Sequence, residues 1–385
     1  MKYIILICML ISGVSYGKEI TIKNLFQIKS LDYDQELVDF FPSEQGLDKA
    51  GWVVVREAAM GMMQNGNRIK ILEIANSKVK SNTTLFESKG KKNIKSIYKT
   101  ATKIIIVAIK KYKSIDIYEF DLKSKKSKVF SLKLNIKNGY IQSTLINSKS
   151  ANEIYLSYVE SGLIKIILMD YMSGAVIWSA ELLSNEGRLG SVVDMIESDG
   201  DVFLAGVISS NAKTKGWLGR ISKDGNVTWQ KVMNEERVQF LEVLLGSQIN
   251  VLQEDTEAGE LFVEPLNNLL FPKENIVPFL VSGYGNYIPW VSELCVNRYL
   301  LINKKTKGKD ISLSASIVKY KGKKIAEKLA ESDLFKIQNG TFINFIPKYT
   351  NKLYLGDSFI YIDADRKLRS GIEFSEIIGK EICEL

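Results

Sequence analysis

The sequence contains no histidine, and it has only 3 cysteines and 6 prolines among its 385 residues. Without an imidazole the chain cannot form a Ser-His-Asp or Cys-His relay, a histidine zinc site or a histidine-ligated haem. Three cysteines are too few for a cysteine-rich metal site. The sequence also lacks a phosphate-binding Walker A run, a dinucleotide-binding GxGxxG motif and a CxxC pair. We therefore expect no metal, no cofactor and no catalytic residue that these motifs would supply.

The overall composition is that of a folded globular protein. Apolar residues make up 45% of the chain and charged residues 25%, which excludes a disordered, collagen-like or disulfide-scaffold protein. A chain of this length folds as one large domain or two ordinary ones.

The first seventeen residues are typical of an export signal. Lys2 gives a positive start, residues 3–14 form an apolar run, and Ser15 and Gly17 are the small residues that precede a cleavage site. The run is too short to span a bilayer, and no later stretch approaches the roughly 20 residues needed. We therefore expect a signal peptide at 1–17, a mature domain at 18–385 without a transmembrane segment, and a location in the periplasm or outside the cell.

Cleavage of the signal would leave two thiols, Cys295 and Cys383. An oxidising compartment favours a disulfide between them, and two buried free thiols are the alternative.

A repeated unit of four short strands is visible in the middle of the chain. Runs rich in Ile, Leu, Val and Tyr lie at 140–147, 153–160, 163–170 and 175–183, and again at 191–197, 202–207, 216–222 and 227–232. Weaker copies of the last two strands lie at 68–86, 117–130, 261–271, 317–325 and 359–368. The seven copies recur at intervals of 43 to 54 residues.

This period predicts an all-β fold, a β-propeller of seven four-stranded blades, with six or eight blades as the alternatives. A twisted four-stranded sheet cannot bury both faces alone and must stack on its neighbours around a ring. Aromatic residues of the outer strands, Trp178, Trp229, Phe130 and Phe271, are predicted to wedge between adjacent blades. A β-sandwich pair or a mixed fold with evenly spaced strands is the competing interpretation.

The ends of the chain leave the closure of the ring open. The N-terminal segment 18–48 contains a strand-like run at 20–28 that can close it, and the segment 371–382 is the other candidate. Residues 35–41 are compatible with one or two helical turns before the first complete blade.

Two of the repeats resemble those of the pyrroloquinoline-quinone-type (quinoprotein, PQQ-like) propellers. In the first, Asp170 is followed by Ser173-Gly174 and, eight residues after the Asp, by Trp178; in the second, Asp224-Gly225 is followed by Trp229. The motif is a packing signature. The adjacent cysteines of the quinoprotein dehydrogenases are absent, so the resemblance implies a non-enzymatic member of the family.

The segment 222–229 also resembles a sialidase Asp-box, with Ser222, Asp224 and Trp229 in place. This likeness implies an alternative function, a carbohydrate-active enzyme that uses two carboxylates in the central channel.

The charge of the chain is unevenly distributed. The net charge is +8, yet residues 78–137 hold seventeen lysines and no arginine against four acidic residues. Such a sector attracts polyanions, although lysines on solvated faces are the plainer interpretation. The candidate binding residues are Lys89, Lys91, Lys92, Lys110, Lys111, Lys113, Lys123, Lys125, Lys126 and Lys128.

These observations favour an exported propeller that acts as a binding or scaffold module. The expected partner is a protein, an anionic glycan or a lipid head group. Export and the lack of a base-reading motif argue against nucleic acid.

Overall fold

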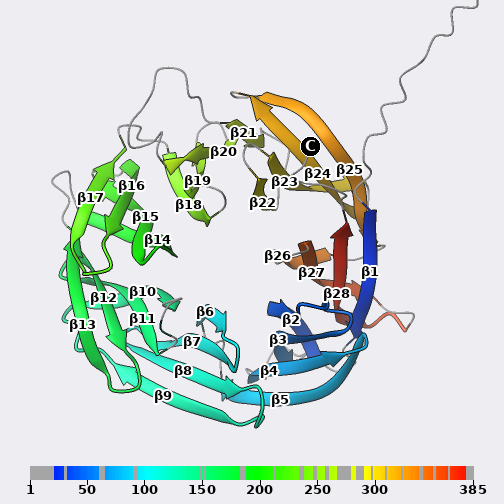
Figure 1. Cartoon of the computed structure of the whole chain (residues 1–385), viewed down its shortest axis with the longest axis horizontal. Helices are drawn as coiled ribbons and strands as arrows, with labels where there is room; N and C mark the ends of the chain where they lie inside the picture. The colour runs from blue at the N-terminus through cyan, green and yellow to red at the C-terminus, as the bar shows by residue number, and fades with distance from the viewer. Residues whose placement is uncertain are drawn as a thin grey trace, which may run out of the picture.

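The computed structural model describes residues 21–378 except for 30–32, 60–65, 90–92, 147–149, 151, 183–187, 211–212, 234–237, 246–248, 256–259, 267–278, 283–289, 296–297, 308–309, 322–323, 338–340, 350–352 and 363–364. Within these residues the strands form seven four-stranded antiparallel sheets that follow one another around a ring (Figure 1). The prediction of an all-β propeller is confirmed.

Six of the sheets use four consecutive strands each. Their bounds are β2 (Tyr33–Pro42), β3 (Ala50–Ala59), β4 (Gly66–Ala75) and β5 (Lys78–Lys89); β6 (Asn93–Lys99), β7 (Lys103–Lys111), β8 (Ser114–Asp121) and β9 (Ser127–Lys133); β10 (Gly139–Ile146), β11 (Glu153–Glu160), β12 (Leu163–Asp170) and β13 (Ala175–Leu182); β14 (Arg188–Ser198), β15 (Asp201–Ser210), β16 (Lys213–Ile221) and β17 (Val227–Val232); β18 (Val238–Leu245), β19 (Ile249–Asp255), β20 (Glu260–Pro265) and β21 (Phe279–Ser282); β22 (Trp290–Cys295), β23 (Arg298–Lys307), β24 (Asp310–Lys321) and β25 (Lys324–Ile337).

The remaining sheet joins the two ends of the described chain. It contains β26 (Thr341–Tyr349), β27 (Leu353–Ile362) and β28 (Leu368–Ile378), and its outer strand is β1 (Thr21–Lys29). β1 pairs antiparallel with β28 from Thr21 opposite Ile378 to Lys29 opposite Gly371. Both of the segments considered for closure therefore take part, and they pair with each other.

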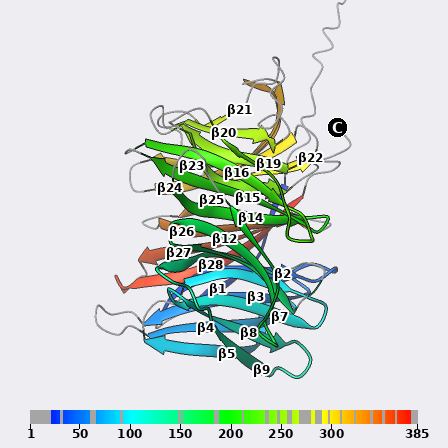
Figure 2. The same ribbon diagram turned by 90° about the vertical axis from the view of Figure 1, so that its left-hand side faces the viewer.

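Burial differs between the middle and the outer strands because each sheet packs face to face against its neighbours. β8 is buried along six consecutive residues, whereas the outer strand β9 has no buried residue. A strand covered on both faces becomes continuously apolar, and a strand at the rim keeps polar residues. Figure 2 shows the ring from the side, where successive sheets lie in layers.

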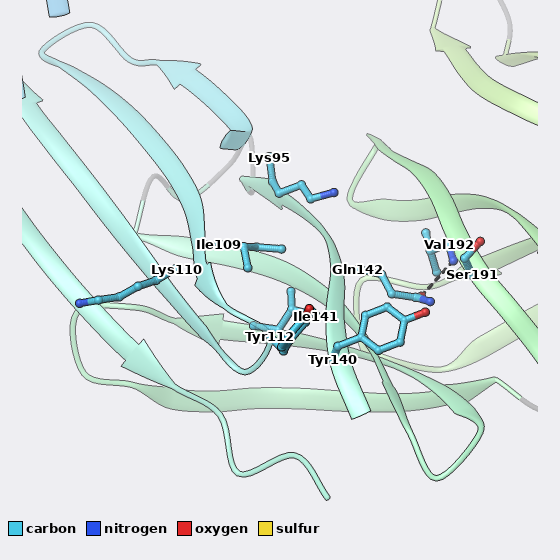
Figure 3. A pocket seen from close by; sticks show the side chains of 9 residues that line it. All are labelled: Lys95, Ile109, Lys110, Tyr112, Tyr140, Ile141, Gln142, Ser191 and Val192. Atoms are coloured by element: carbon cyan, nitrogen blue, oxygen red, sulfur yellow. Dashed lines mark hydrogen bonds between the residues drawn. The ribbon is translucent and has the colours of Figure 1, made fainter. Parts of the chain in front are cut away.

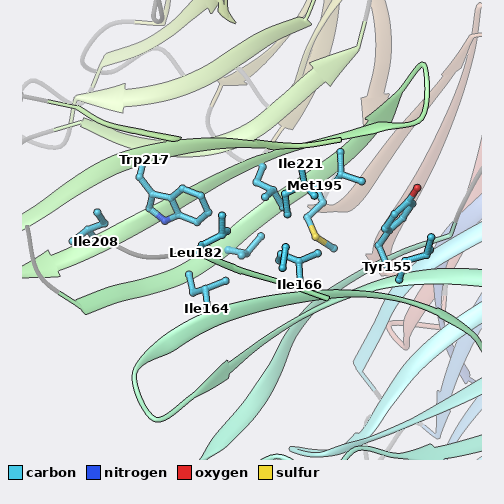
Figure 4. Packing of buried hydrophobic residues seen from close by; sticks show 13 residues of the cluster. Tyr155, Ile164, Ile166, Leu182, Met195, Ile208, Trp217 and Ile221 are labelled. Carbon is cyan, nitrogen blue, oxygen red and sulfur yellow. The ribbon is translucent and has the colours of Figure 1, made fainter. Parts of the chain in front are cut away.

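The hydrophobic core is divided into clusters between neighbouring sheets. Between β10–β13 and β14–β17, the side chains of Ile164, Ile166 and Leu182 pack against Met195 and Trp217 (Figure 4). Full burial of an aliphatic side chain of this size contributes about 1.5 to 3 kcal/mol.

A glycine makes room for the largest side chain of this cluster. A Cβ on Gly206 would lie 2.3 Å from Trp217 Nε1. The absence of a side chain at Gly206 therefore allows Trp217 to lie fully inside the layer.

The turn before the outer strand is built by its aspartate. Asp170 Oδ1 accepts hydrogen bonds from the Ser173 backbone N–H and hydroxyl, and Gly174 adopts a left-handed φ of 73°. These bonds lower the pKa of Asp170. The same turn occurs in the preceding blade, where Asp121 accepts the N–H of Ser124 and Lys125 occupies the left-handed position with a φ of 57°.

Trp178 lies against the corresponding turn of the next blade. Its indole N–H donates to the carbonyl of Lys223 at 3.1 Å. Gly225, with a φ of 82°, turns its bare Cα toward the indole ring, and a Cβ there would lie 2.8 Å from two ring atoms. Asp224 is exposed in that turn, and Trp229 packs onto the core cluster of Ala205, Leu218, Val251 and Leu266.

Two expectations about local structure are wrong, and a third concerns residues outside the described part of the chain. Residues 35–41 form part of strand β2 and contain no helical turn. A shift in pairing between Leu37 and Asp39 lets Leu37 and Phe40 pack into one core with residues of the last sheet. The strand after β20 is β21, and Leu270-Phe271 lie outside the described residues. In the last blade, the run that ends near residue 363 is the second strand, since β28 is third and β1 is fourth.

Residues 1–17 and Cys383 also lie outside the described residues, and Cys295 is the last residue of β22. The described part of the chain has no helix that is both long and apolar enough to cross a bilayer.

Candidate binding groove

A groove of about 700 Å³ opens at one end of the ring, between the second, third and fourth blades. We name this end the Tyr112 face; it carries the β7–β8 turn and the β9–β10 connection, and the opposite end is the Asp121 face, which carries the β8–β9 turn. Figure 3 shows the lining side chains, which are Lys95, Ile109, Lys110, Tyr112, Tyr140, Ile141, Gln142, Ser191 and Val192.

Two of these side chains, those of Lys95 and Gln142, lie at a repeated irregularity of the inner strands. The pairing of β6 with β7 shifts between Ile94 and Ser96, and the pairing of β10 with β11 shifts between Ile141 and Ser143. Lys95 and Gln142 are the residues inserted at the two bulges. A bulge bends a strand and re-aims its side chain, so both residues are directed out of the regular ladder at equivalent places in adjacent blades.

Gln142 connects its blade to the next one. Its Nε2 donates to the carbonyl of Gly190 at 3.1 Å, and its Oε1 accepts the N–H of Val192 at 3.0 Å (Figure 3). Both ends of the amide are thus used by the backbone of β14. Gln142 therefore joins the third blade to the fourth beside the groove.

Two tyrosines stand at the rim. The side chain of Tyr112 is 79% exposed and that of Tyr140 is 44% exposed. The Tyr112 carbonyl accepts the backbone N–H of Ile141 at 2.8 Å, which attaches the β7–β8 turn to β10. The two aromatic rings are therefore held on neighbouring blades by a direct backbone contact.

The two lysines of the groove point in different directions. Lys95 extends across the groove toward the side of Ser191, whereas Lys110 extends away from the other lining side chains (Figure 3). The Lys110 ammonium lies 3.7 Å from the buried carboxylate of Asp116. Among the described residues Lys95 has no ion-pair partner, and its surroundings lower the pKa of its amine by desolvation.

The lining offers hydrogen-bond donors and an apolar floor, and it includes no aspartate, glutamate or cysteine. A two-carboxylate hydrolysis mechanism requires an acid and a base on either side of the bond that breaks. This groove can bind and orient a ligand, but its lining residues supply neither of those groups. Nor do the described residues contain a cluster of three or more potential metal ligands.

The lysines singled out from the sequence fall into two groups rather than one. Lys110 and Lys113 lie at the Tyr112 face, and β5 ends at Lys89 on the same side. Lys123, Lys125, Lys126 and Lys128 lie at the Asp121 face. The eight residues of β8 separate the two ends by roughly 26 Å at about 3.3 Å per residue. Lys91 and Lys92 lie outside the described residues, and only the backbone of Lys89 and Lys111 is described.

Lys125 has a structural contact with the neighbouring blade. Its Nζ lies 4.0 Å from the centre of the Trp52 ring and 3.2 Å from a carboxylate oxygen of Glu73. This lysine fastens the β8–β9 turn to the preceding sheet.

Sequence reasoning missed the residues that make the groove. Lys95 and Gln142 are 47 residues apart, which is within the repeat period, so an alignment of the inner strands would have paired them. Their outward direction depends on the bulges, which leave no pattern in the composition of a strand.

No family model matches the sequence, and no curated protein matches it either. Among solved structures, the Dos1 propeller superimposes with a TM-score of 0.51 at 7% sequence identity and covers 92% of this chain and 95% of its own. This similarity supports the β-propeller fold alone.

Two other solved structures have lower scores. A quinoprotein alcohol dehydrogenase-like protein of Bacteroides thetaiotaomicron gives a TM-score of 0.45 at 11% identity, covering 79% of this chain and 68% of its own. A neuraminidase-like protein of a flat-faced bat influenza A virus gives 0.42 at 9% identity, covering 94% and 89%.

Proposed function

We propose that this protein is a non-catalytic β-propeller binding module, and that an anionic partner binds in the groove at the Tyr112 face. The observation that carries the proposal is the Lys95 ammonium, which projects into a mostly apolar groove whose lining residues are free of carboxylates. Lys95 is exposed, so an anion can reach its ammonium. Nearby apolar surface lowers the effective dielectric constant and strengthens such an attraction.

The proposal includes export. Residues 1–17 support it through their short apolar run and the small residues Ser15 and Gly17. Determination of the N-terminus of the protein made in a bacterial host tests this part: a mature chain that begins at Lys18 supports export, and retention of Met1 contradicts it.

The binding test uses the mature chain and immobilised polyanions, namely dextran sulfate, polyglutamate and phosphatidylglycerol vesicles, with neutral dextran as the reference. We expect at least one polyanion to bind with an affinity that falls as salt is raised, and Lys95→Gln to weaken this binding. Lys126→Gln removes one positive charge at the Asp121 face and is the matched control. Equal effects of the two substitutions, or binding that is indifferent to salt, would overturn the proposal.

A further inference from the structure

We infer that the groove at the Tyr112 face binds an acidic saccharide, a sugar unit that carries a carboxylate. This inference rests on the proposed function and specifies its ligand. The geometry behind it is a single groove that is lined by two rim tyrosines and by Lys95.

The first argument is the exposure of the aromatic rings. A tyrosine that is 79% exposed on a two-residue turn has little stabilising contact within the protein. The face of an aromatic ring is electron-rich and attracts positively polarised hydrogens. The C–H groups on one side of a sugar ring have this polarisation, so Tyr112 and Tyr140 offer two surfaces on which a saccharide can stack.

The second argument is the anchoring of the platform. The hydrogen bond from the Ile141 N–H to the Tyr112 carbonyl fixes the turn to β10, and Gln142 fixes β10 to β14. The rim and the opposite wall are thereby connected through the backbone. Binding to a preorganised site loses less conformational entropy than binding to a site that must first become ordered.

The third argument is the kind and number of polar groups. Lys95 provides one cation, while Ser191 and Tyr140 provide hydroxyl groups that both donate and accept. An ammonium is a compact charge without the fork that a guanidinium offers to phosphate. One ammonium in a groove that also presents hydroxyl groups therefore suits a carboxylate on a hydroxylated sugar better than a doubly charged phosphate.

The size of the groove agrees with a small saccharide. Its volume of about 700 Å³ lies within the range of about 300 to 1,000 Å³ that is usual for small-molecule sites. Ile109, Ile141 and Val192 form an apolar floor on which a sugar can lie, because one face of a pyranose ring is largely C–H.

The experiment is titration calorimetry of the mature chain with short oligomers of galacturonate, glucuronate and mannuronate and with a sialyl trisaccharide, each compared with its neutral counterpart. Phosphatidylglycerol vesicles and polyglutamate are the remaining arms. We expect at least one acidic saccharide to bind tenfold or more tightly than its neutral counterpart. Lys95→Gln should abolish that preference, and Tyr140→Ala should weaken the acidic and neutral forms alike.

The matched control is Lys113→Gln. Lys113 is exposed and adjacent to Tyr112, but it does not line the groove. We expect this variant to bind like the unmodified protein and all variants to retain the same melting temperature. Affinity for the acidic saccharide should also fall toward alkaline pH, because the anion binds the protonated amine of Lys95 and the attraction is lost once that amine deprotonates.

Three results would overturn the inference: no acidic saccharide binds, acidic and neutral forms bind equally, or Lys113→Gln has the same effect as Lys95→Gln. Vesicles or polyglutamate that bind through Lys95 while every saccharide fails would refute the saccharide and leave the proposed function standing. Failure of all anions would refute both.

Discussion

The contact between Trp178 and the β16–β17 turn of the next blade can be measured with two glycine substitutions. Gly174 and Gly225 occupy equivalent turns and have similar left-handed φ angles of 73° and 82°. An alanine at either position suffers the backbone penalty of that conformation, about 1 to 2 kcal/mol. The two positions differ in what the new Cβ meets.

At Gly174 the nearest atom to an added Cβ lies at 3.9 Å, which is ordinary contact, whereas at Gly225 two atoms of the Trp178 ring lie at 2.8 Å. Relief of that overlap requires the indole to move, with its hydrogen bond to the Lys223 carbonyl. Overpacking of this kind costs about 1 to 3 kcal/mol in addition. We therefore expect Gly174→Ala to lower the free energy of unfolding by about 1 to 2 kcal/mol and Gly225→Ala by about 2 to 5 kcal/mol.

The assay is urea unfolding at equilibrium, followed by tryptophan fluorescence and by circular dichroism. Agreement of the two probes checks for a single transition. The difference between the variants isolates the contact with Trp178, because both share the backbone penalty. Equal losses of stability in Gly174→Ala and Gly225→Ala would refute the reasoning and show that the indole does not rest on the turn.

Three further perturbations test other contacts by the same unfolding assay. Tyr171→Phe removes a 2.6 Å hydrogen bond to the buried carboxylate of Glu119 and should cost about 1.5 to 3 kcal/mol; no loss contradicts it. Lys125→Ala removes the cation above Trp52 and should cost about 1 kcal/mol, and an unchanged midpoint contradicts this. Burial raises the pKa of Asp357, so folding takes up a proton and the stability of the unmodified protein falls as pH rises above the ordinary pKa of an aspartate. The stability of Asp357→Asn relative to the unmodified protein should therefore grow by about 1.4 kcal/mol per pH unit up to the folded pKa. Parallel profiles of stability against pH for the two proteins would refute this prediction.

The blades that the sequence predicted well are those with compact turns. The runs predicted at 153–160 and 163–170 coincide with β11 and β12, because a buried apolar strand bounded by turn residues is a local signal. Accuracy fell after β20, where a long connection separates the third strand from the fourth. The last blade was offset by one strand because its fourth strand comes from the other end of the chain, and no local pattern carries that information.

The groove was harder to predict than the ring. Lys95 and Gln142 come from the inner strands of adjacent blades, and each of these two residues reaches the groove through a shift of one residue in pairing. Since a shift of one residue reverses the face on which a side chain lies, alternation along β6 or β10 does not reveal the direction of Lys95 or Gln142. The number of lysines in residues 78–137 predicted one basic sector. Lysines just before β8 and just after it are close in sequence but lie at opposite ends of the ring.

The pairing of β1 with β28 closes the ring with strands from opposite ends of the described chain. Their residues are about 350 positions apart in the chain, and bringing such distant ends together costs about 5 kcal/mol of entropy. The Phe26 and Phe374 rings, 4.9 Å apart, contribute to the interaction that offsets this cost. Until β1 arrives, β28 presents an unpaired edge that the same strand of another copy can occupy. Slow annealing at high concentration should therefore yield strand-exchanged dimers.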